Sequence, residues 1–201
     1  MQGIGIASLV ILVSNIGLSL VGLFIAPRLI ERCLFRPNEF AQGQRRETIV
    51  TSGFVHADLP HLLFNMITFW YFGVPLEARI GTMMFALLYM AGLLLSQYGS
   101  YRKHRDDPAY ATLGASGAIS AVLFAYIVYW PNHSLYMMFI PLPIPAPLFG
   151  VLYLAYTMWS ARQNRGRINH DAHLGGALAG LAFVAIFDPG AYGRAWALLA
   201  R

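Results

Sequence analysis

The chain alternates between long apolar stretches and polar loops, and this alternation is its strongest pattern. Residues 4–26 contain no charged side chain, and roughly 20 apolar residues are enough for a helix to cross a bilayer. We predict six transmembrane helices, at residues 4–26, 60–78, 82–98, 116–130, 145–160 and 171–187. The fold class that follows is an all-α polytopic membrane protein, in which residues 1–201 form one compact six-helix domain with a long first loop.

The composition agrees with a membrane protein. Only 11% of the residues are charged, whereas a soluble domain has about 25%, and the mean hydropathy is +0.54. The net charge of +5 would suggest nucleic acid in a soluble protein, but here the basic residues lie in loops that can contact lipid headgroups. The single cysteine, Cys33, excludes an internal disulfide. We do not expect the first stretch to be a signal peptide, because it is long and no basic residue precedes Arg28.

The loops between the predicted helices differ in kind. In the first loop, residues 27–59, arginines alternate with apolar residues, as in a segment at the membrane interface. Residues 131–147 contain five prolines, which end helices. The helix at 116–130 spans only about 22 Å, against a hydrocarbon core of about 30 Å. We therefore expect Ser116, at its start, to lie below the membrane surface beside a protein cavity or water pocket.

Four polar residues fall at one depth of the predicted bundle. Successive spanning helices alternate in direction, so the second, fourth and sixth helices run the same way. His61 and Asn65 lie in the first turns of the second helix. Ser116 opens the fourth helix and His173 lies at the start of the sixth. Because polar groups inside a span are functional candidates, these four residues form a candidate site.

The chemistry of these residues is that of acyl transfer. A serine needs an adjacent base to act as a nucleophile, and an imidazole accepts a proton near neutral pH. Ser116 and His173 are therefore the candidate nucleophile and base. The transition state also needs donors for its oxyanion, and His61 and Asn65 share one helix face. The free N–H groups at the helix start are further candidate donors.

Small residues recur every four positions on the fourth and sixth helices, a spacing that lets transmembrane helices approach closely. Such an approach would bring His173 to Ser116. The glycines that we expect to pack at the site are Gly114, Gly117, Gly176 and Gly180.

Taken together, the motifs resemble those of the rhomboid family of intramembrane serine proteases, from about residue 51 to 187. The chain carries His-x-x-x-Asn at 61–65, a Gly-x-x-x-Glu stretch within 73–81, Gly-x-Ser-Gly at 114–117 and Ala-His-x-x-Gly at 172–176. Any one of these motifs is weak evidence, and Gly-x-Ser-Gly alone is common. Their order and their placement on the helices are specific.

This resemblance implies an intramembrane serine endopeptidase with a Ser116–His173 dyad and no acidic third member. It also implies an oxyanion site formed by His61, Asn65 and the Ser116 N–H, and His56 matches a further histidine often seen before the second helix. The implied substrates are single-span membrane proteins that enter past the fifth helix, and the implied surroundings are lipid. Neither a cofactor nor a metal nor nucleic acid is expected, and the residues do not predict an oligomeric state.

Three features depart from the family pattern. Glu47-Thr48 stand where the family often has Trp-Arg, so the first loop would be anchored differently. Some members carry a tyrosine, four residues after the nucleophile, that stacks on the catalytic histidine. Here that position is Ser120, so another group must hold His173. Pro75 is expected to kink the end of the second helix.

On orientation, the resemblance and the loop charges disagree. The family places its active site on the extracytoplasmic side, whereas the positive-inside rule would place these basic loops in the cytosol. The small size of the chain and its few residues outside the predicted helices fit a minimal bacterial member, so we expect a bacterial inner-membrane protein. Following the resemblance, we expect its active site to face the extracytoplasmic side. The basic residues on the site side are Arg28, Arg32, Arg36, Arg45, Arg46, Arg102, Lys103, Arg105, Arg162, Arg165 and Arg167.

Other interpretations stay open. A non-catalytic rhomboid-like protein that binds client transmembrane helices would usually lack the serine or the histidine, and this chain has both. A small transporter is disfavoured because the sequence shows no inverted repeat. His170 and Asp171 could join His173 as metal ligands, but no His-Glu-x-x-His motif is present. We expect these two residues to start the sixth helix, with Asp171 at the N-cap or in the first turn.

Overall fold

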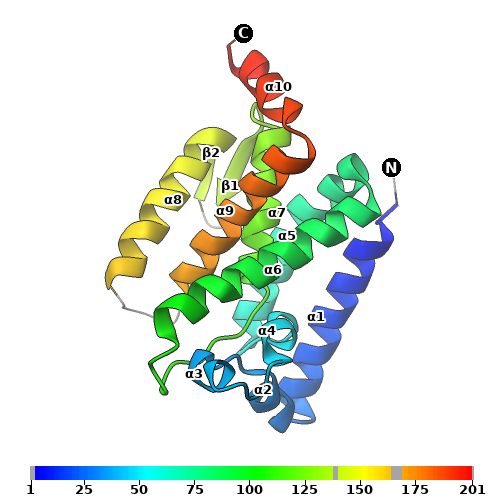
Figure 1. The fold of residues 1–201 in the computed structure, drawn as a ribbon. Coiled ribbons are helices and arrows are strands. Elements are labelled where there is room, and N and C mark those ends of the chain that lie inside the picture. The colour runs from blue at the N-terminus through cyan, green and yellow to red at the C-terminus, as the bar shows by residue number, and fades with distance from the viewer. Residues whose placement is uncertain (1–2, 138–139, 164–168, 201) are drawn as a thin grey trace.

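The computed structural model describes residues 3–137, 140–163 and 169–200, and most of them are helical (Figure 1). Arg165 and Arg167, counted above among the basic loop residues, lie outside these ranges. The long helices are α1 (Ile6–Phe24), α5 (Leu59–Ile80), α6 (Thr82–His104), α7 (Ser116–Tyr129), α8 (Ala146–Gln163) and α9 (His170–Phe187). The short helical elements are α2 (Arg28–Cys33), α3 (Pro37–Ala41), α4 (Thr48–Thr51), η1 (Ser52–Phe54) and α10 (Gly190–Leu199). The fold is that of an all-α polytopic membrane protein.

At the centre of the bundle lies α7. All its residues from Gly117 to Val128 are buried, as expected for a helix that is apolar all round. Within the described ranges, α1, α6 and α9 are each long and apolar enough to cross a membrane, and α7 is a shorter apolar helix. In Figure 1, α2, α3 and α4 gather at one end of the bundle and both chain termini lie at the other.

In several places the structure differs from the sequence prediction. Helix α6 continues to His104, so Arg102 and Lys103 lie in its last turn, where the helix dipole favours cations. The proline-rich segment contains an antiparallel hairpin, β1 (Ser134–Met137) and β2 (Ile140–Pro145), because prolines are tolerated in edge strands. Helix α5 contains Pro75, as predicted, and ends at Ile80, two residues after the predicted end, while α10 was not predicted.

Glu77, buried near the end of α5, binds the start of α1. Its carboxylate accepts hydrogen bonds from the backbone N–H groups of Ala7 at 3.0 Å and Ser8 at 2.7 Å. It also accepts one from the Thr82 hydroxyl at 2.8 Å. The first N–H groups of a helix lack partners within the helix, and a negative charge there is favourable. A Cβ at Gly5 would overlap the carboxylate, so glycine is required for this contact.

Helices α7 and α9 approach each other closely enough for their backbones to touch. A Cβ built at Gly176 would overlap the carbonyl oxygen of Gly117, and one at Gly180 would overlap that of Ala121. The two backbones are therefore in direct contact over one turn of each helix. Such contact is typical of small residues spaced by four in membrane helices.

Replacing Gly176 by alanine should destabilise the bundle by about 1–3 kcal/mol, because the added methyl group must push α9 away from α7. Thermal unfolding in detergent micelles measures this loss of stability. Gly17→Ala is the matched control, since nothing lies within 4 Å of a Cβ there and alanine is the better helix former. Equal stability of the two variants would contradict the direct contact.

Replacing Glu77 by alanine should destabilise the protein by about 1–3 kcal/mol, because two buried N–H groups lose their acceptor. Hydrogen exchange at the backbone N–H groups of Ala7 and Ser8 should be faster in this variant, because they no longer donate to the carboxylate. Glu31→Ala is the control, because its ion pair with Arg36 is exposed and contributes about 0–1 kcal/mol. Unchanged exchange at the start of α1 would refute the role given to Glu77.

Candidate functional site

The chain enters α7 through Gly114, whose φ of +113° lies in the region that favours glycine. Its N–H donates to the carbonyl of Ser52 at 2.8 Å, which fixes the turn to η1. A Cβ at Gly114 would lie 2.6 Å from Cε1 and 2.7 Å from Nε2 of His61. The imidazole of His61 therefore lies against the backbone two residues before Ser116.

Asn169 fixes the start of α9. Its side-chain oxygen accepts from the N–H of Ala172 at 3.0 Å, and its amide nitrogen donates to Ser100 at 2.8 Å and to Thr112 at 3.0 Å. Asn169 is thus the N-cap, and Asp171 lies in the first turn. These bonds join the beginning of α9 both to α6 and to the segment that leads into α7.

Ser116 and His173 flank the contact between α7 and α9. Ser116 precedes Gly117, and a Cβ at Gly117 would lie 3.3 Å from the carbonyl oxygen of Ala172, the residue before His173. Both residues are partly exposed, whereas the rest of α7 up to Val128 is buried. The hydrogen bonds of the described residues do not include one between Ser116 and His173. Catalytic hydrogen bonds are often long without substrate.

His56 supports the entry to α7 from the loop side. It is fully buried, with Nδ1 2.9 Å from the Ser19 hydroxyl and Nε2 accepting from the Ala115 N–H at 3.5 Å. Burial, together with the charge of the nearby His61, lowers the pKa of His56 to about 3. The ring is therefore neutral, and its Nδ1–H donates to Ser19. His56 thus joins α1 to the residue before Ser116.

Asn65 lies one turn beyond His61 on α5. It is 7% exposed, and its Nδ2 has no hydrogen-bond partner among the described residues. Its helix neighbours Leu62 and Met66 belong to the same core cluster as Ala118 of α7. An unpaired buried donor is rare and calls for an explanation, such as a catalytic role.

Tyr153 of α8 was not identified from the sequence. Its ring stacks on that of His173, with centroids 6.3 Å apart and planes inclined at 19°. Its hydroxyl shares a hydrogen bond of 2.8 Å with Ser120. Serine at position 120 was a signal that another group holds His173. Because α8 carries several aromatic residues, the sequence alone could not tell which one does.

Asp171 has hydrogen-bonding partners, whereas His170 has aromatic neighbours and a buried Nδ1 without a hydrogen-bond partner among the described residues. Asp171 accepts from Nζ of Lys103 at 3.0 and 3.1 Å and lies 3.3 Å from Nε2 of His104. His170 is buried, with its ring edge-on to Tyr156 at 5.4 Å. Across the described ranges, no group of three or more His, Cys, Asp or Glu residues is placed to hold a metal.

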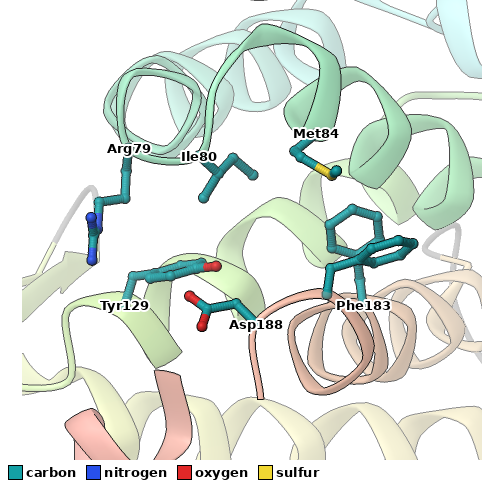
Figure 2. Close-up of a pocket in the computed structure, with 7 residues that line it drawn as sticks. Arg79, Ile80, Met84, Tyr129, Phe183 and Asp188 are labelled. Carbon is teal, nitrogen blue, oxygen red and sulfur yellow. The ribbon is translucent and has the colours of Figure 1, made fainter. Parts of the chain in front are cut away.

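A pocket lies at the opposite end of the bundle, where α5, α7 and α9 end (Figure 2). The guanidinium of Arg79 lies 5.5 Å from the centre of the Tyr129 ring, and Asp188 pairs with Arg194 at 2.6 Å. Tyr129 is the last residue of α7 and Ser116 the first. The full length of α7 therefore separates this pocket from the candidate site.

Comparison with known proteins assigns the family. A family model described as the rhomboid domain matches residues 43–189. The mitochondrial RHOMBOID-like protein 12 of Arabidopsis thaliana is 32% identical over 165 residues, which cover 74% of this chain and 48% of that protein. The mitochondrial Rhomboid protein 1 of Saccharomyces cerevisiae is 30% identical over 187 residues, which cover 88% of this chain and 52% of that protein.

The human presenilin-associated rhomboid-like protein, also mitochondrial, is 32% identical over 139 residues, which cover 68% of this chain and 36% of that protein. The chain thus spans about half the length, or less, of these three relatives.

These relatives contradict the expected location. All three are named as mitochondrial proteins, so the prediction of a bacterial inner membrane is wrong by this comparison. The prediction rested on the small size of the chain and on family resemblance, neither of which identifies a membrane. Location within a membrane is supported, because the matched residues 43–189 include the apolar helices α6, α7 and α9. The matched domain, the order of its motifs and the helical fold together show that this chain belongs to the rhomboid family.

Proposed function

We propose that the chain is an intramembrane serine endopeptidase that cuts peptide bonds in or near the transmembrane segments of membrane proteins. The backbone contact between α7 and α9 carries this proposal, because it brings the helix starts that bear Ser116 and His173 side by side. In the proposed reaction, the Ser116 hydroxyl attacks the scissile carbonyl while His173 takes its proton. His173 then returns the proton to the leaving amine, and water hydrolyses the acyl-enzyme by the same route.

The oxyanion of each tetrahedral intermediate needs preorganised donors. The Ser116 N–H belongs to the first turn of α7, where backbone donors lack partners within the helix. Asn65 supplies a buried amide without a partner among the described residues, and His61 lies against Gly114. These groups come from two helices whose starts lie at the same end of the bundle. They support the assignment of the site to acyl transfer.

For the substrates, we propose single-span membrane proteins. α8 lies at the outer edge of the bundle in Figure 1 and contacts α7 and α9 through a second hydrophobic cluster, separate from the main core. Its outward face is apolar, as expected for contact with lipid. We therefore propose that a substrate helix approaches the site from the bilayer on the side of α8.

A second candidate function is that of a non-catalytic rhomboid protein that binds client transmembrane helices. The observation that favours it is the lack of a hydrogen bond between Ser116 and His173 among the described residues. The retention of both side chains, partly exposed at the same helix contact, favours the protease. A cleavage assay separates the two functions.

Ser116→Ala and His173→Ala should each abolish cleavage of a single-span reporter substrate by the purified protein in lipid vesicles. The first variant lacks the attacking hydroxyl, and the second lacks the group that takes its proton. Circular dichroism of both variants should match the wild type. If either folded variant cleaves at the wild-type rate, the dyad is wrong, and if the wild type cleaves no substrate, the client-binding function gains support.

Asn65→Ala should lower kcat by about 10- to 1000-fold with little change in KM, because a transition-state donor acts mainly on the chemical step. Thr68→Val on the same helix is the control, since its hydroxyl donates to the carbonyl of Phe64 within α5. The two variants are compared by steady-state kinetics in vesicles. An equal kcat for Asn65→Ala and wild type would contradict a catalytic role for Asn65 and leave it with a structural one.

A further inference from the structure

No side-chain hydrogen bond orients the imidazole of His173 within the described part of the chain. Its backbone N–H bonds to the carbonyl of Asn169 at 3.2 Å, which fixes the helix and leaves the ring free to rotate. The ring contacts of His173 are with Tyr153 and, at 6.1 Å and 75°, with His170. A dyad without an acidic residue depends on such contacts to hold its base.

Tyr153 is itself held from three sides. Its hydroxyl bonds to Ser120, which is 4% exposed, so this hydrogen bond is shielded from solvent. Its ring packs against Phe124 of α7 at 5.5 Å and against Phe149 of α8 at 6.1 Å. A Tyr hydroxyl with a buried partner and a ring between aromatic neighbours has few accessible rotamers. Tyr153 is therefore a rigid surface for the His173 ring to lie against.

The phenol comes from α8, the helix on the outer edge of the bundle. Large apolar residues make up the lipid-facing side of α8: Leu148, Val151, Leu152, Tyr156, Met158 and Trp159. At its far end, Nζ of Lys103 donates to the carbonyl of Ala161 at 2.5 Å while pairing with Asp171. Tyr153 and Lys103 are thus two polar connections between α8 and the helices of the site.

We infer that Tyr153 is a positioning residue that holds the His173 ring in the orientation needed to accept the Ser116 proton. The inference rests on the proposed protease function. Tyr153 takes the place of the tyrosine that resembling proteases carry four residues after the serine. Ser120 stands at that position here, and its hydroxyl hydrogen-bonds to Tyr153, whose ring comes from the neighbouring helix α8. Since the ring belongs to α8, the base is held only while α8 is docked on α7 and α9.

Tyr153→Leu should lower kcat for a single-span reporter by about 10-fold or more, with KM changed little, because a misoriented base slows only the chemical step. The rate at which a small fluorophosphonate labels Ser116 should fall in parallel. This probe needs no entry of a substrate helix, so its rate reports the dyad alone. Tyr98→Leu is the control, because Tyr98 is an exposed tyrosine of α6 whose ring contacts Tyr101, and this variant should leave both rates within about 2-fold of wild type.

Two further measurements separate positioning from general packing. Ser120→Tyr in the Tyr153→Leu background returns a ring to the site from α7 and should restore both rates. Tyr153→Phe and Ser120→Ala each remove the same hydrogen bond, so each should lower kcat by a similar few-fold. The double variant should have the same kcat as either single variant, because only one interaction is removed.

Two results would overturn the role of Tyr153 while the protease function stands. One is a kcat loss in the Tyr153→Phe/Ser120→Ala double variant equal to the sum of the two single losses in free energy. The other is unchanged kcat and labelling in Tyr153→Leu. Failure of the proposed function looks different. In that case the wild type is not labelled, or labelling persists in Ser116→Ala.

Discussion

The backbone contact between α7 and α9 is the constraint on which the rest of the structure depends. Gly117 and Gly176 meet without any side chain between them, and Gly180 repeats the contact one turn further against Ala121. Dispersion and close packing stabilise helix pairs in a bilayer, where burial of apolar surface does not. The contact also sets the register of the two helices, so that their first turns lie at one level. A shift of either helix by one residue would rotate its reactive side chain away.

Long-range polar bonds then fix the ends of the helices. Glu77 binds the start of α1, His56 joins α1 to the residue before Ser116, and Asn169 joins α9 to α6 and to Thr112. Such bonds are stronger in a medium of low dielectric, and an unpaired polar group there is costly. Each therefore selects one relative placement of the helices. Several buried polar atoms have no hydrogen-bond partner in the described residues, and among them the amide of Asn65 lies on α5 one turn beyond His61, at the candidate site.

Much of this arrangement follows from local patterns. Hydropathy indicated the long helices, the alternation of direction placed His61, Ser116 and His173 at one end, and spacing indicated the glycine faces. The hairpin was missed because its prolines indicate breaks and a two-stranded ribbon has little periodic signal. Tyr153 was missed because its partners lie on two other helices, and no local pattern encodes such a contact. The membrane in which the protein lies was predicted wrongly, because the hydropathy of a transmembrane helix is similar in all bilayers.

The central claim is that His173 activates Ser116 for nucleophilic attack. Its most direct test is the mass of the intact protein after exposure to a fluorophosphonate, with the modified residue mapped by peptide sequencing. The account predicts a single adduct, on Ser116, in the wild type and a strongly reduced yield in folded His173→Ala. An adduct on another residue, or equal labelling of Ser116 with and without the imidazole, would contradict it.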